Sequence, residues 1–250
     1  MNSPKAPNSP LVNPQIIVGI IGGMGPEATL NLFGKIIEKS KPYVRVDQDH
    51  IRIIIDNNPK IPDRTEFIMK KGKSPLPQIV KTAQTLEKAR VTLGVISCMT
   101  SHYFFDDIQG SVTFPILNAY IETYNFILQN HPNVKKIGVL ATTGTRSTKL
   151  FEKYITGKEI IFPSLFTQEN KVMEAIYGEQ GIKKGIISTQ NAKLLVEASN
   201  ELITEGAEII IAGCTEIPLV LKQNMLKVPI IDPMDVVAEV IVEKAYFIRN

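Results

Sequence analysis

The sequence lacks any apolar run of the roughly 18–20 residues that a membrane-spanning helix needs. It also lacks a strong excess of charge, because 28 basic and 25 acidic residues leave a formal net charge of +3. The basic residues are scattered rather than gathered in one stripe, so neither a membrane nor nucleic acid is a predicted partner. At 250 residues the chain is long enough for one large or two modest domains with buried cores.

Cysteine is scarce as well. The chain has two, Cys98 and Cys214, and they form no CxxC pair. Together with the three histidines they lack the spacing of zinc ligands, so no metal site is predicted. The segment 1–14 is rich in proline and has no apolar centre, which predicts a disordered N-terminal extension rather than a secretory signal. The predicted location is the cytoplasm, where a structural disulfide is not expected.

Apolar, β-rich runs alternate with longer helical patterns along the whole chain. Strands are predicted at 16–21, 51–55, 91–97, 136–140, 160–162, 208–212 and 228–231, and helices at 28–39, 79–89, 172–176, 190–205 and 234–247. Continuous apolar strands separated by helices are typical of parallel sheets that are covered on both faces. The predicted fold class is therefore α/β.

The order of these elements repeats within the chain. Gly138 lies 119 residues after Gly19, and Cys214 lies 116 residues after Cys98, in matching strand contexts. This spacing predicts a duplication that gives two similar α/β lobes, with the C-terminal ends of their strands meeting at a central cleft. The first lobe is predicted to comprise 15–117 plus 232–250, and the second 118–231.

Each cysteine directly follows a buried strand, at the edge where ligands of α/β proteins bind. A helix that begins there would favour the thiolate. Inverting an α-carbon needs a base on one face and an acid on the other, and a thiolate and a thiol fill these roles. Pseudosymmetric lobes would place Cys98 and Cys214 on opposite faces of a substrate, which indicates racemisation. The alternative is that each is a small apolar core residue.

The glycine-rich segment 22–29 opens the first predicted helix. It lacks the GxGxxG order and the GK[ST] ending of nucleotide-binding loops, so a nucleotide site is weakly supported. Its glycines favour close backbone approach and donation of N–H groups to a carboxylate at a helix start. The predicted turn 141–145 offers comparable donors from the second lobe.

Two cations are candidates for binding an anionic group. Arg64 lies in the predicted loop 57–64, where its guanidinium either binds a carboxylate through two hydrogen bonds or is solvated. Lys171 is predicted to begin a helix, and its local pattern alone indicates a solvated side chain. His102 lies four residues beyond Cys98 and either tunes the thiol or has a structural role.

Five motifs together resemble the aspartate/glutamate racemase family, in particular its aspartate racemase branch. They are GIIGGMGPEAT, NNPKIPDRT, SCMTSHYF, ATTGTRST and AGCTEIPL, and they occur in the family's order. The resemblance extends from about residue 16 to the closing helix. It implies two Rossmann-like lobes related by a pseudo-dyad, an active site in the cleft between them, a homodimer, and a reaction without pyridoxal phosphate or another cofactor.

The resemblance also implies roles for individual residues. Cys98 and Cys214 match the acid/base pair, Arg64 the residue that binds the side-chain carboxylate, and Lys171, in a QENKV match, its cationic helper. Glu216 matches a group that supports the second cysteine, and His102 is a second supporting candidate. The remaining residues implied to bind substrate or line the cleft are Met24, Met99, Thr100, Thr143, Thr145 and Thr215.

One position departs from the family pattern. Met99 stands where the family usually has an asparagine, within Cys-Asn-Thr-Ala-His. A thioether cannot donate the two hydrogen bonds of an amide, and losing that group costs about 1–3 kcal/mol if its partner stays unpaired. Altered substrate preference, reduced activity and a compensating donor such as Ser101 are the alternatives.

The predicted function is interconversion of L- and D-aspartate, with glutamate as a further substrate. Two alternatives stay open. One is another activity of the wider superfamily: hydantoin racemase, maleate isomerase or malonate decarboxylase. The other, suggested by Met99, is a catalytically silent protein that binds a dicarboxylate.

Overall fold

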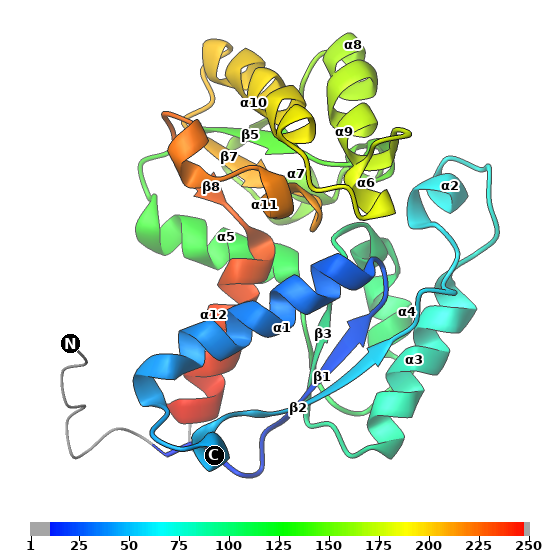
Figure 1. Ribbon diagram of the computed structural model, residues 1–250, viewed down its shortest axis with the longest axis vertical. Helices are drawn as coiled ribbons and strands as arrows, with labels where there is room; N and C mark the ends of the chain where they lie inside the picture. Colours follow the sequence, from blue (N-terminus) through cyan, green and yellow to red (C-terminus); the bar gives the residue numbers. More distant parts are fainter. Residues whose placement is uncertain (1–10, 248–250) are drawn as a thin grey trace.

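The computed structural model describes residues 11–247, and this part of the chain contains two four-stranded sheets, each parallel throughout. The strand order is β2-β1-β3-β4 in the first sheet and β6-β5-β7-β8 in the second, so both sheets have the same topology. Helices flank both sheets (Figure 1). The predicted α/β fold with two similar parallel sheets is confirmed.

The first sheet and its helices are formed by the N-terminal half of the chain. The strands are β1 (Ile17–Gly22), β2 (Arg52–Asn57), β3 (Leu93–Ile96) and β4 (Ile116–Leu117), and the helices are α1 (Pro26–Ser40), α2 (Arg64–Ile68), α3 (Leu76–Lys88) and α4 (Phe105–Gln109). Single 3₁₀ turns occur at Lys41–Tyr43 and Asp47–Asp49, and a longer one at Thr100–Phe104.

The second sheet repeats this plan with more helical segments. Its strands are β5 (Lys136–Leu140), β6 (Glu159–Ile161), β7 (Ile209–Ala212) and β8 (Ile230–Ile231). The helices are α5 (Ala119–Asn130), α6 (Thr143–Thr148), α7 (Leu150–Tyr154), α8 (Leu165–Thr167), α9 (Glu174–Tyr177), α10 (Thr189–Thr204), α11 (Ile217–Val220) and α12 (Pro233–Tyr246). A π-helical turn at Gln168–Met173 joins α8 to α9, and 3₁₀ turns lie at Ile182–Lys184 and Gln223–Met225.

The turn after β1 places the start of α1 at the same sheet edge as Cys98. Gly23 has a φ of +86°, and a Cβ there would lie 2.3 Å from the carbonyl carbon of Asn58, so the turn requires glycine. Pro26 then begins α1, where its missing N–H costs nothing. The turn therefore brings the backbone of residues 23–25 close to the candidate site.

The last described helix, α12, connects the two halves. It packs against α1 and against α5 (Figure 1), and Lys35 of α1 pairs with Asp232 and Asp235 at its start. One apolar cluster includes Val18 of β1 and Val139 of β5, so the core continues from one sheet to the other. Residues 1–10 of the predicted extension 1–14 lie outside the described residues; the amide of Asn13 donates to the carbonyl oxygen of Ala245 at 2.8 Å.

Two local predictions are wrong. The predicted turn 141–145 contains a helix start, because the Thr142 hydroxyl accepts a hydrogen bond from the amide of Thr145 and caps α6. Lys171 does not begin a helix either. The helical segment begins at Leu165, capped by the Ser164 hydroxyl, and Lys171 lies within the π-helical turn.

Candidate active site

The two cysteines occupy matching places in the two sheets. Cys98 lies just past the end of β3, and Cys214 lies just past the end of β7. Each of these strands neighbours the first strand of its sheet, so each thiol lies where the strand order changes direction, the usual ligand position in open α/β sheets. Both cysteines are free and buried, with 5% and 4% of their surface exposed.

The Cys214 thiol is held by Glu216, which is in turn paired with Lys183. Its sulfur donates to Glu216 Oε2 at 3.0 Å, and Lys183 Nζ lies 2.7 Å from Glu216 Oε1. Burial raises the pKa of Cys214 well above its usual value, and the charge of Glu216 raises it further. Burial opposes ionisation of Glu216 too, but Lys183 and the hydrogen bonds lower its pKa overall. Glu216 is therefore a carboxylate beside a protonated Cys214.

Cys98 lies beside a buried guanidinium. Arg64 is the first residue of α2, and Asp63 caps this helix by accepting from the amide of Glu66. Burial lowers the pKa of Arg64, but the charge of Cys98 and a hydrogen bond to it help raise the value above normal. Arg64 is only 6% exposed, so the solvated alternative is wrong. Its Nη2 donates to the carbonyl oxygen of Met24 at 3.0 Å, and its Nε has no partner.

The structure places Lys183, rather than Lys171, beside Glu216 and Cys214. Lys183 Nζ pairs with Glu216 and lies 5.3 Å from the centre of the Tyr177 ring. Lys171 pairs with Glu197 of α10, and both side chains are partly exposed. Sequence reasoning missed Lys183, whose only local signal is a short segment between Gly181 and Gly185.

Threonine hydroxyls join the two lobes beside the cysteines. Thr100 and Thr145 lie 2.8 Å apart, and Thr65 donates to Thr142 at 3.1 Å. These four side chains are buried. The two predicted threonines in this group, Thr100 and Thr145, therefore meet across the lobes, whereas Thr65 and Thr142 are additions from the structure.

The other two predicted threonines have different contacts. Thr215 Oγ1 donates to Glu216 Oε2 at 3.2 Å and so belongs to the Cys214 cluster. Thr143 Oγ1 donates to Glu169 Oε1 at 2.8 Å, toward the π-helical turn. Thr143 is thus not one of the threonines whose hydroxyls join the two lobes.

Both predicted methionines are buried, each 1% exposed. Met24 packs in the apolar cluster that contains Cys98, and its sulfur accepts from the Ser101 hydroxyl at 3.2 Å. Met99 packs in the apolar cluster that continues between the two sheets. Met99, the position that departs from the family pattern, therefore packs in the core. The Ser101 hydroxyl donates to the sulfur of Met24.

His102 has the geometry of a neutral structural histidine. The amide of Ala119 donates to Nε2 at 3.2 Å, so Nε2 is an acceptor and Nδ1 carries the proton that is donated to the carbonyl oxygen of Cys98, 2.9 Å away. Burial lowers the pKa of His102 to about 4, although hydrogen bonds with the backbone of Cys98 and Met99 oppose this shift. The ring fixes the turn after Cys98 to the start of α5 and contacts no thiol through these bonds.

Stability is expected to fall on acidification because of His102. The folded state holds the pKa near 4, below the value of 6.5 for an exposed histidine, so the unfolded chain binds more protons between these values. The contribution is complete above pH 6.5 and is lost as the pH falls toward 4; between pH 7 and pH 5 the loss is roughly 2 kcal/mol. Urea unfolding at the two pH values measures it. The variant His102→Gln should flatten this dependence, and an unchanged slope would contradict the assignment.

Two tyrosines near the thiols were not singled out by the sequence. Tyr120 is fully buried, and burial and then the charges of both cysteines raise its pKa, which places it within electrostatic reach of both thiols. The hydroxyl of Tyr177 donates to Asp63 Oδ2 at 2.9 Å and so links α9 to the residue that caps α2. Neither had a motif to mark it.

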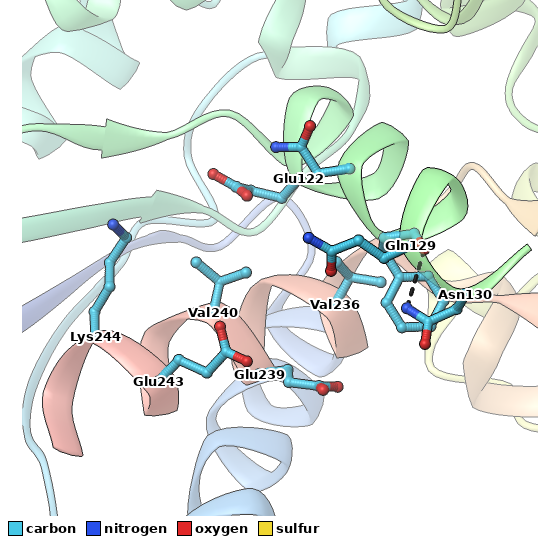
Figure 2. A pocket seen from close by; sticks show the side chains of 10 residues that line it. Glu122, Gln129, Asn130, Val236, Glu239, Val240, Glu243 and Lys244 are labelled. Carbon is cyan, nitrogen blue, oxygen red and sulfur yellow. Dashed lines mark hydrogen bonds between the residues drawn. The ribbon is translucent and has the colours of Figure 1, made fainter. Parts of the chain in front are cut away.

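A surface pocket between α5 and α12 is a poor candidate for the same role. Figure 2 shows Glu122 of α5 and Glu239 and Glu243 of α12 around it. No cysteine or arginine lines this pocket, and its carboxylates would repel an anionic substrate. In the described part of the chain, no helix is both long and apolar enough to cross a membrane.

Comparison with known proteins agrees with this fold and shows the family of the chain. The sequence matches the family described as Asp/Glu/Hydantoin racemase over residues 21–241. A broad-specificity amino-acid racemase of Bacillus subtilis (strain 168) is 30% identical over 225 residues, which cover 86% of this chain and 92% of the relative.

Solved structures show the same two-lobed arrangement. An aspartate racemase of Picrophilus torridus is 24% identical with a TM-score of 0.74, covering 92% of this chain and 94% of that one. An aspartate racemase homologue from Pyrococcus horikoshii OT3 is 26% identical with a TM-score of 0.71, covering 92% and 99%. The likeness includes both sheets of the present chain.

Proposed function

The chain belongs to the Asp/Glu/hydantoin racemase family, and from that premise we propose that it interconverts L- and D-aspartate, or the enantiomers of glutamate, without pyridoxal phosphate. One observation carries the proposal: two buried thiols lie at matching strand ends, with buried Arg64 near Cys98 and partly buried Lys183 near Cys214. The charge of Cys98 helps raise the pKa of Arg64, and Lys183 pairs with Glu216, which accepts a hydrogen bond from Cys214. Inverting an α-carbon requires an acid/base group on each face, and the cations suit the carboxylates of an anionic amino acid.

The mechanism is a proton transfer on each face of the α-carbon. Cys98, as the thiolate, takes the α-proton, and the electron pair of the broken C–H bond stays on the substrate as a carbanion. Cys214 then delivers its thiol proton to the opposite face and becomes the thiolate. The other enantiomer uses the same steps with the two roles exchanged.

The remaining residues bind and orient the substrate. Arg64 and Lys183 are suited to the carboxylates, because a buried guanidinium and a partly buried ammonium attract anions more strongly than cations in open solvent do. Glu216 holds Cys214 in its protonated, donating state. The hydroxyls of Thr100 and Thr145 are available at the junction of the lobes if their mutual bond opens.

The test is isotope exchange. The purified chain is incubated with L-aspartate, and separately with D-aspartate, in D₂O without added pyridoxal phosphate. The expected result is α-deuterated aspartate of both configurations. NMR measures the deuterium at the α-carbon, and chiral chromatography separates the two enantiomers. Absence of exchange with aspartate, glutamate and related acids would refute the proposal. Thermal stabilisation by a dicarboxylate without exchange would favour a silent binding protein. A covalent succinyl adduct formed on separate incubation with maleate would favour a maleate isomerase.

A broader substrate range is the second candidate. Met99 packs in the apolar core and supplies no amide to the site, and the relative from Bacillus subtilis is described as a broad-specificity racemase. The same exchange assay with a panel of neutral and acidic amino acids distinguishes a broad-specificity racemase from one that acts on aspartate or glutamate alone. The homodimer, the cytoplasmic location and the division into lobes 15–117 plus 232–250 and 118–231 stay predictions.

A further inference from the structure

Gln168 carries a buried hydrogen-bond acceptor that nothing in the described chain satisfies. The residue begins the π-helical turn and has no exposed surface, yet its Oε1 has no hydrogen-bond partner. A buried polar atom without a partner costs free energy, and such atoms are rare in folded proteins. π-helical turns occur frequently at functional sites. Both features indicate that a ligand atom completes the environment of Gln168.

The assignment of oxygen and nitrogen in this amide follows from its neighbours. Nε2 lies 2.9 Å from the carbonyl oxygen of Ala141, which can only accept. It also lies 3.4 Å from Thr143 Oγ1, whose own proton is donated to Glu169. Both Nε2 protons therefore have acceptors, and the free atom is the oxygen. A ligand at this position must be a hydrogen-bond donor.

Gln168 lies at the edge of the second sheet that carries Cys214. Ala141, which binds its amide, directly follows β5, and the amide of Gly213 donates to Leu140 in the neighbouring position. Gly213 is followed by Cys214. The side chain is thus anchored to the backbone beside the strand end that carries the second thiol.

Arg64 is its counterpart in the first lobe. Each residue follows the second strand of its sheet, and each donates to a carbonyl oxygen just past the first strand, Met24 or Ala141. Within residues 11–247 the buried side-chain atoms without hydrogen-bond partners are Arg64 Nε, Gln168 Oε1 and Asp232 Oδ2, and the last is in an ion pair with Lys35. One unpartnered donor and one unpartnered acceptor therefore remain, one in each lobe.

We infer that Gln168 Oε1 accepts a hydrogen bond from the α-ammonium group of the amino acid, an inference that rests on the proposed function. Carboxylates have no proton to donate, and Arg64 and Lys183 are available for them. The ammonium group needs an acceptor. The carboxylate of Glu216 already accepts from Lys183, Cys214 and Thr215, whereas the oxygen of Gln168 is free.

The test compares two ligands that differ in this group alone, aspartate and succinate, by calorimetry. The wild-type chain should bind aspartate more tightly than succinate. In Gln168→Met, which has similar volume and only a weakly accepting sulfur in place of the amide oxygen, the Kd of aspartate should rise about 10- to 100-fold, as for one hydrogen bond to a charged group. The Kd of succinate should change less than about twofold. Asn170→Ala, an exposed change on the same turn, is the control and should alter neither.

Several results would contradict this role of Gln168, and each can be distinguished from failure of the proposed function. Wild-type binding of succinate as tight as that of aspartate would overturn the inference without any variant, and so would equal weakening of both ligands in Gln168→Met. If that variant does not fold, Gln168→Glu, which retains an acceptor oxygen, should keep the preference for aspartate. Loss of that preference in folded Gln168→Glu, or a water as the bound donor with aspartate present, also overturns it. α-Proton exchange by the wild-type chain tests the proposed function independently of these ratios.

Discussion

Replacing either cysteine by serine is expected to lower the rate of racemisation by about 10³- to 10⁴-fold, the upper part of the range for loss of one acid/base group. A hydroxyl is a far weaker acid than a thiol, so it neither takes nor gives the α-proton efficiently. Cys98→Ser and Cys214→Ser are nearly isosteric, and the serine hydroxyl at 214 can still donate to Glu216. Aspartate binding should therefore stay within a few fold of wild type.

The two variants also show on which face of the substrate each cysteine acts. Each retains one thiol on one face, so each should wash deuterium from solvent into one enantiomer without inverting it, and the two variants should act on opposite enantiomers. NMR of L- and D-aspartate in D₂O measures this. If one variant racemises at the wild-type rate, the corresponding cysteine is a core residue and the two-base mechanism fails.

Lys183→Met is expected to destabilise the fold by about 3–5 kcal/mol at neutral pH, because it leaves the Glu216 carboxylate buried without its cation. Lys171→Met is the matched control. Its partner Glu197 and Lys171 itself are partly exposed, so the expected loss is below about 1 kcal/mol. Racemisation should fall in the first variant and remain in the second. Urea unfolding and the exchange assay measure the two effects.

The pH dependence separates this mechanism from simple loss of packing. In the wild type the pKa of Glu216 is lowered, so its contribution is present above the unfolded pKa and is lost as the pH falls. In Lys183→Met burial acts without the cation and raises that pKa, so stability should instead be lost as the pH rises. Adding Glu216→Gln should restore much of the stability. A deficit that is constant with pH and unaffected by the second change would show that Lys183 acts through packing.

The strands and the positions of the cysteines could be predicted because they depend on local pattern. Buried parallel strands are continuous apolar runs, as in the stretch that forms β7, and each cysteine directly follows such a run. Predicting the duplication required only the order of these apolar runs along the chain. The predicted bounds differ from the structure by a few residues, as for β8, which is shorter than the apolar run that contains it.

The residues that depend on the path of the chain between elements could not be predicted. Lys183 lies in a short turn whose sequence is like that of any exposed lysine pair, and only the fold places it, partly buried, beside Glu216. Gln168 lies in no motif that marks it, and its significance depends on the absence of a hydrogen-bond donor to its buried Oε1 among the described residues. The helix α5 was missed because its apolar residues do not form one stripe: Ile121 and Leu128 are 44% and 43% exposed.

The position of α12 has a consequence for biosynthesis. This helix is the last described element to leave the ribosome, yet it covers α1, which is among the first, and Ile241 and Ala245 are fully buried in the cluster that includes Leu32. Until it emerges, the nascent chain displays the apolar face of α1 to the surrounding solution, where exposed surface of this kind favours aggregation or chaperone binding. The helix α1 is thus among the first elements translated and among the last to be covered.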